Sequence, residues 1–205
     1  MKVVCMLLII GVLMLGCGKI CHHDHYGFKA TAQFYPENDS IAVGDTIWFT
    51  SSVPVKNTDT ISNQIINYGG ASNFSTDINF NSIEDPLKIS EIEGAIDSFS
   101  FISMVGSLKE NPFEPKGSLA ISYSEGSVYY QNSFAFVALK KGIYAVTVVD
   151  IENSYKRCAK AYVSLTLSNI NKHQEFLKIT YYPGSPFGDT IPEIEQTHTY
   201  CFKVY

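Results

Sequence analysis

The chain has 205 residues, with 15 Lys and Arg against 20 Asp and Glu, giving a formal net charge of −5. Because Arg157 is its only arginine, the chain lacks the basic surface that nucleic-acid binding requires, and it lacks a polybasic patch for anionic lipid. Tyr, Phe, Ser, Thr, Asn and Ile are abundant, whereas the helix-favouring residues Leu, Ala and Arg are few. This bias favours strands, so the composition predicts an all-β protein without a nucleic-acid partner.

The N-terminus has the layout of a secretory signal peptide. Lys2 precedes an apolar run over residues 3–15, and a glycine and Cys17 follow. The run is too short to cross a hydrocarbon core, which needs about 20 apolar residues. Its ending, Leu-Met-Leu-Gly-Cys, resembles the bacterial lipobox, in which the signal is cut before the cysteine and the cysteine is acylated. The resemblance implies a cleaved signal peptide over residues 1–16 and a mature chain held to a membrane by lipid on Cys17.

Residues 17–28 have no apolar period, and we interpret them as the lipidated cysteine and a flexible tether. Alternate residues of an extended chain share one side, so Cys21, His23 and His25 could converge on a Zn, Cu or Ni ion. A functional metal site, however, needs ligands held by a packed second shell, which a tether does not offer. We therefore expect adventitious metal binding at most, and no cofactor.

The first strand is predicted over residues 29–35, where Ala30, Ala32 and Phe34 alternate with polar residues. Turn residues follow, and a second strand over residues 46–51 carries Trp48, the only tryptophan. A large ring of this kind is usually a core anchor. We expect Trp48 to be buried between two sheets.

The pattern weakens over residues 53–85, where short strands are predicted at 64–68 and 76–80, and a further strand follows at 95–105 before a loop at 106–117. The second half contains one short helical turn near residues 170–177. Its strands are predicted at 118–123, 128–132, 134–139, 143–151, 161–168, 178–182 and 199–205. Roughly ten short strands without helical periods between them predict a single β-sandwich domain over residues 29–205.

The run Lys-Gly-Ile-Tyr-Ala-Val over residues 141–146 is similar to the entry to strand F of immunoglobulin-like sandwiches. There the tyrosine, here Tyr144, bonds back to upstream backbone as a tyrosine corner. Val146 stands where antibody domains have a cysteine, which implies no buried disulfide between the sheets. With residues 41–48 and the lipobox, the chain resembles uncharacterised lipoproteins of the Bacteroidota. That resemblance implies a lipid-anchored, immunoglobulin-like antiparallel β-sandwich at the bacterial outer membrane, on its periplasmic or its surface side, with no assigned activity.

Three cysteines, Cys21, Cys158 and Cys201, remain after signal removal and lipidation, so at most one internal disulfide forms. Cys158 and Cys201 each lie at the margin of a strand-like run. Their parity places both thiols on solvent-leaning faces of what we expect to be neighbouring strands. Our preferred pair is therefore Cys158 with Cys201, and the alternative is that both stay unpaired.

The tripeptide Asp-(Ser/Thr)-Ile occurs four times, at residues 39–41, 45–47, 59–61 and 189–191. It matches the O-glycosylation acceptor pattern of exported Bacteroidota proteins, and Ser40 and Thr60 are the more loop-like acceptors. The alternative is turn chemistry, because Asp followed by a hydroxyl residue often begins a strand.

The sequence contains no recognisable catalytic motif. His173 and His198 are isolated, and the chain has no Gly-x-Ser-x-Gly elbow, His-Glu-x-x-His motif or phosphate-binding glycine loop. Several tyrosines could form a binding platform, with cross-strand pairing as the alternative; they are Tyr123, Tyr129, Tyr130, Tyr181, Tyr182, Tyr200 and Tyr205.

The sequence therefore predicts a non-enzymatic envelope lipoprotein that acts as a binding or structural module. Its expected partners are the membrane, through the lipid, and an envelope protein or a glycan. The alternative is an accessory glycan-binding lipoprotein of a nutrient-uptake system.

Overall fold

A computed structural model describes residues 24–83, 93–114, 116–168, 174–180, 184, 185, 188 and 190–205. The predicted signal peptide, Cys17, Cys21 and His23 lie outside these residues, as do His173, Tyr181 and Tyr182.

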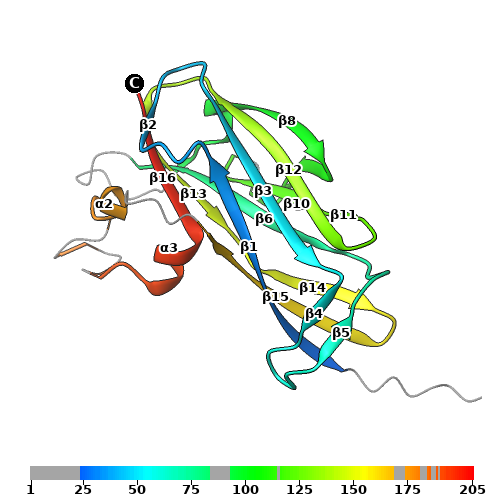
Figure 1. Ribbon diagram of the computed structural model, residues 1–205. Helices are drawn as coiled ribbons and strands as arrows, with labels where there is room; N and C mark the ends of the chain where they lie inside the picture. Colours follow the sequence, from blue (N-terminus) through cyan, green and yellow to red (C-terminus); the bar gives the residue numbers. More distant parts are fainter. Residues whose placement is uncertain are drawn as a thin grey trace, which may run out of the picture.

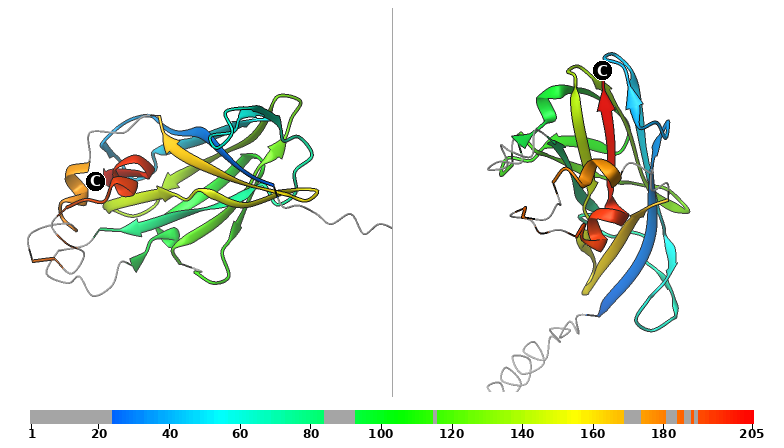
Figure 2. Two further views of the ribbon diagram at one scale, coloured as in Figure 1. Left: turned by 90° about the horizontal axis from the view of Figure 1, so that it is seen from below. Right: turned by 90° about the vertical axis from the view of Figure 1, so that its left-hand side faces the viewer.

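Two sheets of seven strands each pack face to face, as Figures 1 and 2 show. In the first, called sheet A, the order is β11-β12-β3-β1-β15-β14, and β8 pairs with β12. Its strands are β1 (His25–Tyr35), β3 (Thr46–Pro54), β8 (Phe99–Val105), β11 (Ser124–Glu125), β12 (Tyr129–Ala138), β14 (Ile151–Lys156) and β15 (Ala159–Leu167).

The second sheet, called sheet B, has the order β2-β16-β13-β6-β10-β9, with β7 paired to β6. Its strands are β2 (Ser40–Ile41), β6 (Ser75–Ser82), β7 (Glu93–Gly94), β9 (Ser107–Glu110), β10 (Ser118–Ser122), β13 (Gly142–Val148) and β16 (Thr199–Val204). A separate hairpin joins β4 (Lys56–Thr58) to β5 (Ile65–Asn67). The helical segments are short: η2 (Ile96–Ser98), α2 (Gln174–Leu177) and α3 (Glu193–His198).

The core lies between the sheets and is built by period-2 alternation. In β1, Phe28, Ala30, Ala32 and Phe34 are buried, while the residues between them face outward. Phe136 of β12 is fully buried among rings from both sheets. The predicted β-sandwich is thus confirmed. Its pairings are antiparallel except for β1 with β15 and β2 with β16.

The tyrosine corner is also confirmed. Tyr144 of β13 donates its hydroxyl hydrogen toward the carbonyl oxygens of Lys140 (3.1 Å) and Lys141 (3.3 Å). Gly142, two residues before Tyr144, has a φ of 159°. A Cβ at Gly142 would lie 3.0 Å from the Tyr144 ring. The corner therefore favours glycine, which has no side chain, at this position.

Some boundaries differ from the sequence prediction. β1 begins at His25, four residues before the predicted start, because Phe28 is buried and is in register with Val163 of β15. The predicted strands 128–132 and 134–139 form one continuous strand, β12. Among the described residues, no helix is long and apolar enough to span a membrane.

Candidate binding face

The outward face of β12, β3 and β1 is an open surface of sheet A. In Figure 1 the three strands lie side by side, and no described element is drawn in front of them. Their alternation turns polar and aromatic residues outward while the phenylalanines point inward. We call this surface the β12-β3-β1 face.

One row of the β12-β3-β1 face is aromatic and apolar. The register places Tyr35 opposite Trp48, Trp48 opposite Ala135, and Ala135 opposite Ile102 of β8. The exposed fractions are 66% for Tyr35, 39% for Trp48 and 51% for Ile102. Three large side chains in one cross-strand row therefore remain accessible to a partner.

The expectation that Trp48 anchors the core is wrong. Ile47 and Phe49, its neighbours in β3, are both fully buried, and the alternation of a strand then turns Trp48 to the opposite side. The ring is available at the surface because the inward positions are already filled.

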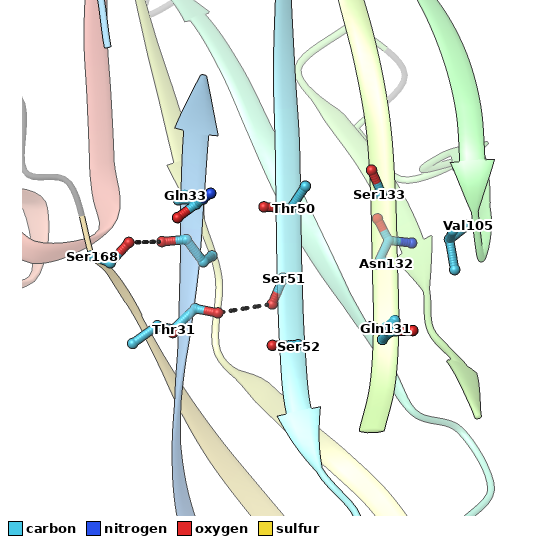
Figure 3. A pocket seen from close by; sticks show the side chains of 11 residues that line it. Thr31, Gln33, Thr50, Ser51, Ser52, Val105, Gln131, Asn132, Ser133 and Ser168 are labelled. Atoms are coloured by element: carbon cyan, nitrogen blue, oxygen red, sulfur yellow. Dashed lines mark hydrogen bonds between the residues drawn. The ribbon is translucent and has the colours of Figure 1, made fainter. Parts of the chain in front are cut away.

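Beside the aromatic row lies a shallow hollow of about 310 Å³, shown in Figure 3. It spans three successive residues on each of β1, β3 and β12. Its lining residues are Thr31, Ala32, Gln33, Thr50, Ser51, Ser52, Val105, Gln131, Asn132, Ser133 and Ser168. None of these side chains carries a charge, and nine of the eleven carry a hydroxyl or an amide.

Three of the polar residues that line the hollow, Ser51, Asn132 and Ser168, make hydrogen bonds within the protein. Ser51 donates its hydroxyl to the Thr31 carbonyl oxygen at 3.5 Å, and Ser168 donates to the Ala32 carbonyl oxygen at 3.4 Å. Asn132 donates its amide nitrogen to the Ser122 carbonyl oxygen at 2.8 Å. Its Oδ1 is buried and accepts no hydrogen bond from the described part of the chain. Thr50, Ser52 and Gln131 turn hydroxyl and amide groups outward, so the hollow can both donate to and accept from a neutral polar ligand.

The cysteine prediction is wrong. Cys201 is a buried thiol and not half of a disulfide. It lies on β16 of sheet B and packs with Ala145 and Leu177, whereas Cys158 lies in the turn between β14 and β15 of sheet A. The two strands that parity made neighbours belong to different sheets. Burial, followed by the charge of Glu195, raises the pKa of the Cys201 thiol to about 12.

Both proposed glycan acceptors are exposed. Ser40 lies on the short edge strand β2, and Thr60 lies in the loop between β4 and β5. Of the weak metal candidates, His25 is described and is exposed at the start of β1. In the described ranges, no three His, Cys, Asp or Glu side chains are placed to hold a metal ion together.

The tyrosines do not form a common platform. Tyr130 and Tyr200 are buried, and the Tyr130 hydroxyl donates to the Tyr68 carbonyl oxygen at 3.0 Å. Tyr123 donates to the Ser51 hydroxyl at 3.0 Å. Tyr129 and Tyr205 are exposed, on β12 and at the last residue. Most of the described candidates therefore serve the core.

Two carboxylates, Asp150 and Asp59, accept hydrogen bonds from segments that are distant in the sequence. These contacts were not predicted from the sequence. Asp150 accepts hydrogen bonds from the Leu165 N–H (2.7 Å) and the Tyr162 hydroxyl, and its Oδ1 lies 3.2 Å from His198 Nε2. Hydrogen bonding to Asp150, then burial and nearby charge, raises the pKa of Tyr162 to about 12. This carboxylate joins β15 to α3, so we interpret the cluster as structural.

Asp59, buried in the loop between β4 and β5, accepts from the backbone N–H of Gly27 at 2.8 Å. It also accepts from the Ser62 N–H (2.8 Å) and hydroxyl (2.6 Å). Burial acts to raise the pKa of Asp59, but these hydrogen bonds and one from the Ile61 backbone outweigh it, and the pKa falls to about 2. The Asp59-Thr60-Ile61 tripeptide thus forms a turn stabilised by the Asp59 carboxylate, which is the alternative to glycosylation that the sequence left open.

No protein-family model matches the chain, and no curated protein sequence matches it. Among solved structures, it is similar to the human F-spondin reeler domain, with 9% identity and a TM-score of 0.36 over 73% of this chain and 93% of that one. It is similar to a cohesin module from a Clostridium perfringens family 33 glycoside hydrolase, with 11% identity and a TM-score of 0.32 over 67% and 98% of the two chains. A type II cohesin domain from the Acetivibrio cellulolyticus cellulosome gives 12% identity and a TM-score of 0.23 over 60% and 75%. Because all three TM-scores are below 0.5, these likenesses say nothing about what the chain binds.

Proposed function

We propose that this protein is a non-enzymatic binding module that contacts its partner through the β12-β3-β1 face. The observation that carries the proposal is the exposed row of Tyr35, Trp48 and Ile102 beside a neutral, hydrogen-bonding hollow. Large aromatic side chains left open on a sheet contribute binding energy when a partner covers them.

We further propose that lipid on Cys17 displays this module at the bacterial outer membrane. The lipobox-like sequence supports this, and so does the start of β1 at His25, eight residues after Cys17. Incorporation of labelled palmitate tests the anchor. A Cys17→Ala form should lose the label and leave the envelope fraction; label or envelope retention in that form would contradict the proposal.

An envelope protein is the first candidate partner. The centre of a protein interface is enriched in aromatic residues and Met and depleted in charge. The aromatic row fits that pattern, and Met104, also exposed, lies on the adjoining strand β8. A partner lying flat across the four strands would cover this row.

A glycan is the second candidate, and the hollow itself favours it. Sugar hydroxyls donate and accept, as do the Ser, Thr, Gln and Asn side chains that line the hollow. Trp48 and Tyr35 occupy the row next to Thr50 and Gln33, where one ring could stack on a sugar. This is the alternative of an accessory glycan-binding lipoprotein.

Three single variants separate these candidates: Trp48→Ala in the aromatic row, Gln131→Ala in the hollow, and Lys203→Ala on sheet B as the matched control. For a protein partner, we expect Trp48→Ala to weaken binding by at least 2 kcal/mol, about 30-fold, and Gln131→Ala to weaken it less. For a glycan, saturable binding in affinity gels and on a glycan array should fall in both variants. If neither variant differs from Lys203→Ala while all three keep the wild-type Tm, the face is not the binding surface.

A further inference from the structure

Cys158 lies in the turn that joins β14 to β15, close to the start of β1, where His25 pairs with Lys160. It is half of a disulfide. Cys201, the other cysteine of the described ranges, is a buried thiol. Within this chain, the cysteines left to pair with Cys158 are those before residue 24, which are Cys5, Cys17 and Cys21.

The register of β1 and β15 narrows this choice. The two strands are parallel with His25 opposite Lys160, and the Lys160 N–H donates to the Asp24 carbonyl oxygen at 2.9 Å. Cys158 is only two residues from Lys160, so it lies at the same edge of sheet A as the start of β1. Cys21 is three residues from Asp24, so its Cα lies within about 11 Å of the Asp24 Cα. A disulfide needs Cα atoms about 4.4–6.8 Å apart, and the short step along the chain from Cys21 to Asp24, the first described residue, allows that approach.

We propose that Cys21 and Cys158 form a disulfide that fastens the chain preceding β1 to the β14–β15 turn. The choice of Cys21 over Cys5 and Cys17 rests on the proposed lipidation, because signal cleavage removes the first and acylation occupies the second. Separation along the chain also favours Cys21, the cysteine nearest in sequence to β1. The bond joins the two sulfurs as each thiol loses a proton and an electron. A protein disulfide of the exporting compartment accepts both electrons and both protons and becomes a dithiol.

The disulfide would shorten the connection between the lipid and the sandwich. From Cys17 to Asp24 the extended chain reaches about 25 Å, whereas from Cys17 to Cys21 it reaches only about 14 Å. The β14–β15 turn and the start of β1 would then stay near the bilayer. The disulfide also removes Cys21 from any metal site with His23 and His25, because a half-cystine sulfur is not a thiolate ligand.

The test is a thiol map of the full-length mature protein isolated from envelopes. Denatured, unreduced protein is alkylated with N-ethylmaleimide, digested and analysed by mass spectrometry. We expect a linked peptide pair containing Cys21 and Cys158, with Cys201 alkylated. Alkylated Cys158, or Cys158 linked to any other cysteine, would overturn the proposal.

Two variants complete the test, and because alkylation is done on denatured protein the readout does not depend on folding. Cys21→Ser should make Cys158 alkylatable, whereas the matched Cys201→Ser should leave the linked peptide unchanged. A linked Cys158 in Cys21→Ser would overturn the assignment. The same spectra separate this proposal from the lipid anchor. An unacylated Cys17 with the Cys21–Cys158 link intact refutes the anchor alone, and a Cys17–Cys158 link refutes both.

Discussion

Asp59 offers a sharp test of how the loop between β4 and β5 is held against the start of β1. Asp59→Ala removes the acceptor for the Gly27 N–H and for the N–H and hydroxyl of Ser62. Hydrogen bonds to charged groups contribute about 1.5–3 kcal/mol each, and here they share one carboxylate, so we do not add them. We expect Asp59→Ala to lower the free energy of unfolding by about 3 kcal/mol.

Asp59→Asn is the graded companion variant. Its Oδ1 can still accept from Gly27, but its amide nitrogen cannot accept from Ser62. We expect roughly half of the Asp59→Ala effect. Ser62→Ala, which removes only the 2.6 Å hydroxyl bond, should cost about 1 kcal/mol.

The stability that the Asp59 carboxylate contributes should depend on pH in a defined direction. The folded-state pKa of Asp59 is about 2, below the ordinary value of 3.8. A carboxylate with a lowered pKa contributes stability that is fully present above the unfolded pKa and is lost as the pH falls through the folded pKa. The stability gap between wild type and Asp59→Asn should therefore be constant above about pH 5 and should shrink as the pH falls from about 4 to about 2.

Urea unfolding followed by far-UV circular dichroism measures these free energies. Thr60→Ala, at an exposed neighbouring position, is the matched control and should stay within about 0.5 kcal/mol of wild type. The reasoning is refuted if Asp59→Ala also stays within 0.5 kcal/mol, or if the gap to Asp59→Asn does not shrink in acid.

Three further predictions concern the core and the surface. Phe136→Ala should lower the free energy of unfolding in urea by about 3–5 kcal/mol, because Phe136 is fully buried. The control Phe113→Ala, at a side chain that is 92% exposed, should lower it by under about 0.5 kcal/mol. Similar losses in the two variants would contradict the assigned core. Tyr144→Phe should cost about 1 kcal/mol in the same assay, with partner binding unchanged, because it removes only the corner hydrogen bonds; no loss would deny the corner an energetic role. Intact-mass measurement of protein from native cells should show hexose-type increments that disappear in the double variant Ser40→Ala/Thr60→Ala; a mass equal to polypeptide plus lipid would reject glycosylation.

Local alternation was sufficient to predict most of the strands and the sandwich. Ala30, Ala32 and Phe34 line the core as their spacing predicts. The Tyr144 corner was equally readable, because its hydrogen bonds reach only three and four residues back. The general preference of tryptophan for cores fails at Trp48 because the flanking residues Ile47 and Phe49 take the inward positions of the strand.

Long-range relations could not be predicted in this way. Parity says which side of a strand a residue faces, but not which sheet the strand joins, so Cys158 and Cys201 were paired across two different sheets. The hollow could not be predicted for the same reason, because its lining residues come together only when β1, β3 and β12 pair in the sheet. Asp59 is 32 residues from its Gly27 donor, and no local pattern marks that bond.

The most direct test of the β12-β3-β1 face is site-specific photo-crosslinking in intact native cells. A benzoylphenylalanine at Gln131 or Thr50 reports on the hollow, and the same residue at Lys109, exposed on β9 of sheet B, is the control. We predict a discrete adduct, to one protein or to glycan, from positions 131 and 50 but not from 109. Equal adducts from all three positions, or an adduct from position 109 alone, would contradict the assignment of this face as the binding surface.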